Sequence, residues 1–63
     1  MTVTTDTPEY CLGLAGRMDA QGSMTPNARV LWERGRTMCE HGHVRGGLAR
    51  LRRAMLVMRG AAE

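Results

Sequence analysis

The chain has no lysine and no phenylalanine, and its 63 residues include one Trp and one Tyr. No apolar run approaches the ~20 residues that a membrane-spanning helix needs, so we expect no membrane segment. Because aromatic residues are scarce, Met, Leu, Val and Ala must fill the core, and Met specifies packing weakly. A chain this short buries only about 60% of its unfolded surface. We therefore expect one domain that needs a covalent link, a partner or self-association for stability.

All nine basic residues are arginine, and the formal net charge is +3. Codon bias in a GC-rich genome is the simplest explanation for the missing lysine. The alternative is selection for the guanidinium group, which binds phosphate and carboxylate in a bidentate manner. The charge is uneven, because residues 44–63 hold five Arg and one Glu, a net +4, which leaves −1 for residues 1–43.

The N-terminal residues 1–6 predict a disordered tail, because they are polar and have nothing to bury. They have neither a basic start nor an apolar run, so we predict no signal peptide. This favours the cytoplasm, unless the chain is the mature fragment of an exported protein. Residues 7–63 are expected to form a single helical domain.

Three segments carry helix signals. Thr7-Pro8 and Thr25-Pro26 each place a good N-cap before a proline at the first helical position. Gly42 is a good residue to end the second helix, and apolar residues recur at intervals of three and four in all three segments. The sequence therefore predicts an all-α fold of three short antiparallel helices, at about 8–21, 26–41 and 44–59.

Folding the second segment onto the third about residue 41 places Gly35 opposite Gly47, and Leu31 opposite Leu51. Small residues then meet small ones and large residues meet large ones. Close approach of two helices is thus the predicted reason for glycines inside helices, where they are otherwise unfavourable.

Folding the first segment onto the second about Thr25 places Cys11 opposite Cys39, on the apolar faces of both helices. A disulfide there would close a loop of about 29 residues and contribute about 3.6 kcal/mol in the chain-entropy description. The alternative is a pair of buried free thiols in a reducing cytosol. We favour the disulfide, which would imply an oxidising compartment.

One cluster, Cys39, His41 and His43, has residue types that bind metals. With Cys11 it could supply four zinc ligands, but its spacing matches none of the usual Cys or His pairs. We therefore predict no metal and no cofactor. A nucleophile would need an oriented base and an oxyanion site. A chain this small has little room for them, so we expect no enzymatic activity.

The third segment combines a basic face with apolar residues outside its apolar stripe. Arg50 and Arg53 lie opposite the stripe, and Leu56 and Val57 fall outside it. Exposed apolar residues on a small protein often mark an interface. We predict that these four residues contact a partner protein or a second copy of the chain. The alternatives are a solvated surface, a small nucleic-acid-binding protein that uses this Arg-rich helix, and an inhibitor or adaptor from a mobile element.

The stretch from Leu31 to Val57 has glycine in the middle of its first helix and in its turn. A small residue, a large apolar residue and an alanine then follow at set intervals. These positions are Gly35, Gly42, Gly47, Leu51 and Ala54.

In this pattern the stretch resembles one tetratricopeptide repeat over 27 of the 63 residues. It departs from the repeat at Trp32, which is one place from the usual aromatic, at Gly47, where Ala is usual, and in lacking a Pro after the second helix. The resemblance implies a protein-binding helical scaffold with no catalytic residues. Glu9-Tyr10-Cys11 and residues 38–42 also resemble small bacterial helical proteins, which implies no function.

Overall fold

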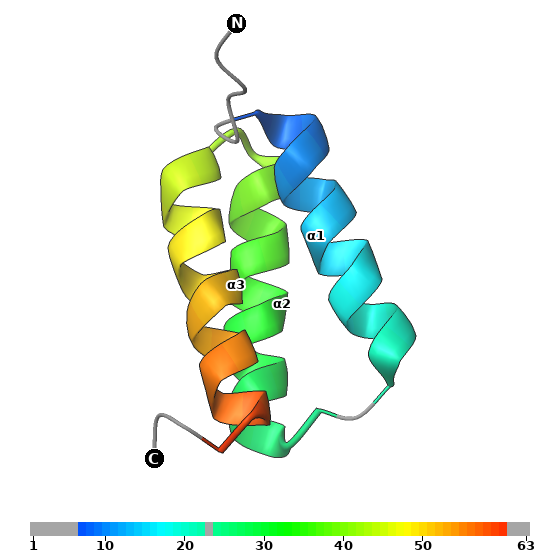
Figure 1. Ribbon diagram of the computed structural model, residues 1–63. Coiled ribbons are helices and arrows are strands. Elements are labelled where there is room, and N and C mark those ends of the chain that lie inside the picture. Colours follow the sequence, from blue (N-terminus) through cyan, green and yellow to red (C-terminus); the bar gives the residue numbers. More distant parts are fainter. Residues whose placement is uncertain (1–6, 23, 61–63) are drawn as a thin grey trace, which may run out of the picture.

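The computed structural model describes residues 7–22 and 24–60. They form three α-helices: α1 (Pro8–Gln21), α2 (Pro26–Glu40) and α3 (Val44–Met58). In Figure 1, α2 runs antiparallel to both other helices, and α1 is tilted relative to the α2–α3 pair. The predicted all-α fold is confirmed, and α2 and α3 each end one residue earlier than expected. The predicted disordered tail, residues 1–6, lies outside the described residues.

The helix ends follow from the residues that cap them. Thr7 Oγ1 accepts a hydrogen bond from the Tyr10 backbone N–H at 3.1 Å, and Thr25 Oγ1 accepts one from the Ala28 N–H at 3.2 Å. Gly42, after α2, has a φ of +85°, a left-handed conformation that glycine adopts without steric cost. Both predicted threonine caps and the glycine stop are therefore confirmed.

The core lies between the three helices and is built from small and medium-sized side chains. The apolar residues that recur at intervals of three and four in α1 are buried, and α3 contributes two leucines and an alanine to the same cluster. The buried members of this cluster are Cys11, Leu14, Ala15, Met18, Cys39, Leu48, Leu51 and Ala54. Apolar residues at the margins, including Leu31, Trp32 and Met55, are partly buried against it.

The α2–α3 pair approaches closely where the two predicted glycines meet. A Cβ atom on Gly47 would lie 2.8 Å from the Gly35 carbonyl oxygen and 2.8 Å from Cys39 Sγ. A Cβ atom on Gly35 would lie 2.9 Å from the Gly47 carbonyl oxygen. Real Cβ atoms do not come this close to backbone oxygens, so the helices can cross here because both residues are glycine. The predicted pairing of Gly35 with Gly47 is confirmed.

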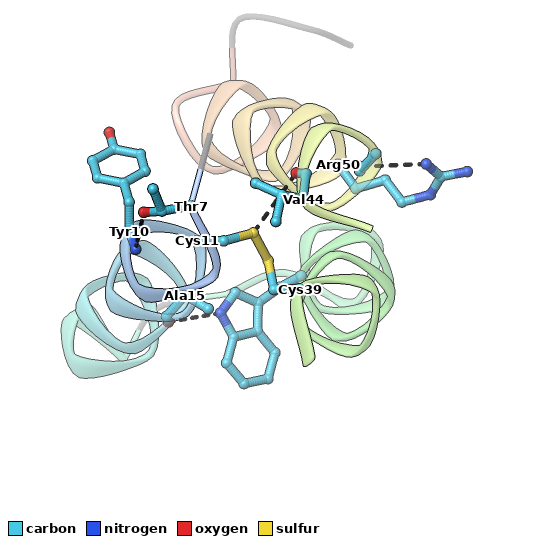
Figure 2. The surroundings of a disulfide bond; sticks show 9 residues. Thr7, Tyr10, Cys11, Ala15, Cys39, Val44 and Arg50 are labelled. Atoms are coloured by element: carbon cyan, nitrogen blue, oxygen red, sulfur yellow. Dashed lines mark hydrogen bonds between the residues drawn. A yellow bond between two sulfur atoms is a disulfide. The ribbon is translucent and has the colours of Figure 1, made fainter. Parts of the chain in front are cut away.

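A disulfide joins Cys11 of α1 to Cys39 of α2, as predicted (Figure 2). The two Cα atoms are 5.7 Å apart, and both residues are almost fully buried. Cys11 Sγ also lies 3.8 Å from the Val44 carbonyl oxygen, at the start of α3. Because Cys39 Sγ lies against Gly47, the bridge contacts all three helices at one end of the bundle.

A hydrogen bond provides a second link between α1 and α2. The indole Nε1–H of Trp32 donates to the Ala15 carbonyl oxygen at 2.9 Å (Figure 2). The Arg36 guanidinium carbon lies over the Trp32 ring, 5.8 Å from the ring centroid. The single Trp therefore has its polar atom satisfied within the fold.

In the described ranges, no helix has both the length and the apolar character that crossing a membrane requires.

Candidate functional site

A shallow hollow lies between the outer faces of α2 and α3, and we call it the basic hollow. Four of its lining residues are arginines and three are apolar. The lining residues are Leu31, Arg34, Ala49, Arg50, Arg52, Arg53 and Leu56. No residue of α1 lines it, and Figure 2 shows Arg50 directed away from α1.

Helical periodicity explains how α3 presents this surface. One face of α3 packs into the core, and its buried residues are Gly47, Leu48, Leu51 and Ala54. Residues at intervals of three and four on the other side must then point outward. That set contributes the α3 part of the hollow: Ala49, Arg50, Arg52, Arg53 and Leu56. From α2, Leu31 and Arg34 reach the hollow along the edge that borders α3.

Three of the four predicted contact residues meet in the basic hollow. Arg50, Arg53 and Leu56 all line it, and the Leu56 side chain is 44% exposed. Val57 is partly buried and does not line the hollow, although it neighbours Leu56 in sequence. Two apolar residues of the other helices, Leu12 of α1 and Val30 of α2, are 39% and 49% exposed.

The charge of the basic hollow is not compensated by its own lining, which contains no acidic residue. Arg50 donates from Nη1 to the Gly46 carbonyl oxygen of its own helix at 3.4 Å. Within residues 7–22 and 24–60, no ion pair engages Arg34, Arg52 or Arg53. These guanidinium groups therefore keep donors available for an external anion.

A second hollow continues the surface along the same pair of helices. Its lining shares Arg34 and Arg50 with the basic hollow and adds Glu33, Thr37 and Met38. The acidic Glu33 enters only in this continuation. The available surface is therefore elongated along the helix axes, with its positive charge concentrated toward the Leu56 end.

Arg34 and Arg52 are members of the hollow that sequence reasoning does not select. A spacing of seven places Arg52 on one flank of α3 with Arg45 and Arg59, and Arg34 lies on the other helix, α2. Folding α2 onto α3 about residue 41 places Arg34 opposite Leu48, so the pairing that predicts the glycine contact does not by itself bring Arg34 to Arg50.

The four residues that could act as metal ligands, two cysteines and two histidines, lie in different surroundings. Cys11 and Cys39 are joined in the disulfide, and His41 and His43 are exposed at the α2–α3 turn. Among the residues the structure describes, no three His, Cys, Asp or Glu side chains form a group that could hold a metal ion. Neither Cys is a free thiol that could act as a nucleophile.

Comparisons of the chain with protein-family models, with curated proteins and with solved structures gave no match.

Proposed function

We propose that the protein is a non-enzymatic helical interaction module that binds another protein through the basic hollow. The observation that carries this proposal is Leu56, which is 44% exposed in a hollow that four arginines also line. Leu56 is not a member of the buried core cluster, and covering it would remove apolar surface from water. The surrounding guanidinium groups would add charge-assisted hydrogen bonds to a partner.

The helical hairpin formed by α2 and α3 supports the same proposal. Gly35 and Gly47 allow close approach, Gly42 forms the turn, and Leu51 and Ala54 are buried. These are the positions on which the resemblance to a tetratricopeptide repeat rests. Repeats of that kind present helical surfaces to protein partners. In this proposal α1 takes the place of a neighbouring helix, because it covers one side of the hairpin.

The chemistry of the side chains also favours a binding role. Both thiols are consumed by the disulfide, so no thiolate is left for nucleophilic catalysis. The two histidines are exposed on the turn, without the buried surroundings that orient a general base. The guanidinium groups of the arginines are hydrogen-bond donors that can bind anions.

The first test places a photo-crosslinking amino acid, p-benzoylphenylalanine, at position 56 or at position 30. Val30 is a matched control, because its side chain is 49% exposed on α2 and does not line the hollow. In cells that make the protein, we expect a protein adduct from position 56 and none from position 30. No adduct at 56, or equal adducts at both positions, would contradict the proposal.

Leu56→Asp is the matching substitution. It should abolish the adduct formed by a crosslinker at position 53 while leaving the helical circular dichroism unchanged, because Leu56 is not in the core. Val30→Asp should leave the adduct in place. Loss of helicity in Leu56→Asp would show that Leu56 is needed for folding and would remove the argument.

Nucleic-acid binding is the second candidate, favoured by the four arginines that line one hollow. Such binding would weaken steeply as salt rises from about 50 to about 200 mM, because phosphate contacts release counterions. It would also be lost in Arg50→Ala/Arg53→Ala. If fluorescence anisotropy detects no binding to single- or double-stranded DNA or RNA at the lower salt, this candidate is excluded.

A further inference from the structure

We infer that the partner of the basic hollow is an acidic amphipathic α-helix supplied by another protein. This inference rests on the proposed function and names the chemistry of the partner. The juxtaposition that carries it is three apolar residues, Leu31, Ala49 and Leu56, which line one hollow between two antiparallel helices together with Arg34, Arg50, Arg52 and Arg53; we call the three apolar residues the apolar strip.

The shape of the surface fits a helix. The basic hollow and its continuation follow the α2–α3 pair, whose helices each have 15 residues. Their lining residues fall within 31–38 of α2 and 49–56 of α3, so at about 1.5 Å per residue the surface is about 12 Å long, which is about two turns of a partner helix. The α2–α3 pair already accepts a helix on its other side, where α1 packs with Cys11, Leu14, Ala15 and Met18 buried. A helix laid in a groove is also a common way to bind an amphipathic peptide.

The chemistry of the surface specifies both faces of that helix. The apolar strip would pack against Leu-like side chains that recur at intervals of three and four on the partner helix. The arginines call for carboxylates beside them, because a guanidinium group binds a carboxylate with two parallel hydrogen bonds. No carboxylate lines the basic hollow, and Arg34 and Arg53 have no ion pair within the described ranges. Acidic groups in the basic hollow itself must therefore come from the partner, since Glu33 lines only the continuation.

A second copy of the chain does not fit this surface. In a two-fold symmetric dimer the same patch meets itself, so the four arginines of one hollow would face the four arginines of the other. Like charges brought together at an interface oppose association. Self-association through this face is therefore disfavoured by the same residues that favour an acidic partner.

The phosphate groups of a nucleic acid would pair with the arginines, but they would not cover the apolar strip. Single-stranded nucleic acid binds to surfaces on which aromatic side chains stack with the bases. Neither aromatic residue of this chain lines the hollow, and Trp32 is held by its hydrogen bond to Ala15. Phosphate groups would also place charge against Leu31 and Leu56. An acidic helix with an apolar stripe satisfies both parts of the surface.

The test uses the 63-residue chain, labelled with ¹⁵N, and three probes. The first is a synthetic helix matched to α2 in length, 15 residues, with Leu at intervals of three and four and Glu beside them. The second replaces each Glu with Gln, and the third is a DNA duplex with its two single strands. Titration followed by NMR should show the Glu peptide shifting the amides of Arg50, Arg53 and Leu56. The Gln peptide should bind at least about tenfold more weakly.

Charge-reversal variants identify which arginines bind the Glu peptide. Arg50→Glu/Arg53→Glu should lower the affinity for the Glu peptide by at least about tenfold, because two attractive contacts become repulsive. Arg17→Glu/Arg29→Glu changes the net charge equally, but neither residue lines the hollow. This control should weaken binding by less than about threefold, because distant exposed charges are screened by salt.

Three results would overturn the inference: equal binding of the Glu and Gln peptides, an equal effect of the two charge reversals, or tighter binding of DNA that is lost in Arg50→Glu/Arg53→Glu. The crosslinking test separates this inference from the proposed function. If position 56 yields protein adducts but the Glu peptide does not bind, the interaction module stands and the acidic helix is wrong. If neither is observed, both fail.

Discussion

Gly47→Ala adds one methyl group at the point where α2 and α3 meet. The new Cβ would lie 2.8 Å from the Gly35 carbonyl oxygen, 2.8 Å from Cys39 Sγ and 3.1 Å from the Cys39 backbone nitrogen. Two of these atoms belong to the α2 backbone, and the third is fixed by its bond to Cys11. Since none of them can rotate away, the helices themselves must move apart.

Two opposing effects determine the expected magnitude. Alanine is a better helix former than glycine by about 1 kcal/mol, which stabilises the variant. Overpacking in a well-packed core costs about 1–3 kcal/mol, and the rigid contacts at Gly47 place it in the upper half of that range. The free energy of unfolding should therefore fall by about 1–2 kcal/mol. In a domain of this size, that corresponds to a Tm lower by roughly 4–16 °C.

Two other glycines provide matched controls for the same substitution. Gly16, on the exposed side of α1, has no atom within 4 Å of the position that a methyl group would take, so Gly16→Ala should gain up to about 1 kcal/mol from helix propensity. Gly46 is adjacent to Gly47, but its Cβ would meet the terminal methyl group of Met38. That flexible side chain can rotate, so Gly46→Ala should change stability by less than about 1 kcal/mol.

The assay is thermal and urea unfolding followed by far-ultraviolet circular dichroism, with the disulfide intact in every variant. We expect Gly16→Ala to be more stable than the unsubstituted protein, and Gly47→Ala to be less stable. If Gly47→Ala is as stable as Gly16→Ala, α2 and α3 do not approach closely at Gly35 and Gly47, and the reasoning is refuted.

Two further predictions concern the links between α1 and α2. The intact mass of the unreduced protein should be two hydrogens below that of the reduced protein, and reduction should lower the free energy of unfolding by about 3.6 kcal/mol for a loop of about 29 residues; two thiols open to alkylation without reductant would contradict the bridge. Trp32→Phe removes the hydrogen bond to Ala15, so it should lower the free energy of unfolding by about 1–2 kcal/mol in urea titrations. An unchanged midpoint would show that this hydrogen bond does not stabilise the fold.

Much of the fold could be predicted from the sequence because its signals are local. Thr-Pro pairs at Thr7 and Thr25 set two helix starts, and Gly42 set one helix end, since caps depend on a few neighbouring atoms. Short connections then restrict the pairing of helices. Reflection about Thr25 was enough to bring Cys11 and Cys39 together, and the structure has this bridge.

The basic hollow was harder to predict because it belongs to two helices at once. Periodicity places Arg50, Arg53 and Leu56 on the outward side of α3, but one helix does not reveal what its neighbour contributes. The contribution of Arg34 therefore could not be predicted from α3 alone. The same limit applies to the hydrogen bond from Trp32 to Ala15, which depends on the tilt of α1 and not on the spacing of residues. Helix tilt depends on side-chain packing across the whole core.

The disulfide also changes the connectivity of the chain, because it closes residues 11–39 into a covalent ring that contains most of α1 and α2. A single cut by trypsin inside the ring leaves both pieces attached until a reductant is added. A cut beyond the ring releases a C-terminal fragment at once. Of the nine arginines, four lie inside the ring and five follow it: Arg17, Arg29, Arg34 and Arg36 inside, and Arg45, Arg50, Arg52, Arg53 and Arg59 beyond. α3, which carries most of the basic hollow, is thus joined to the other helices by the backbone alone. α1 and α2 are joined to each other both by the backbone and by the disulfide.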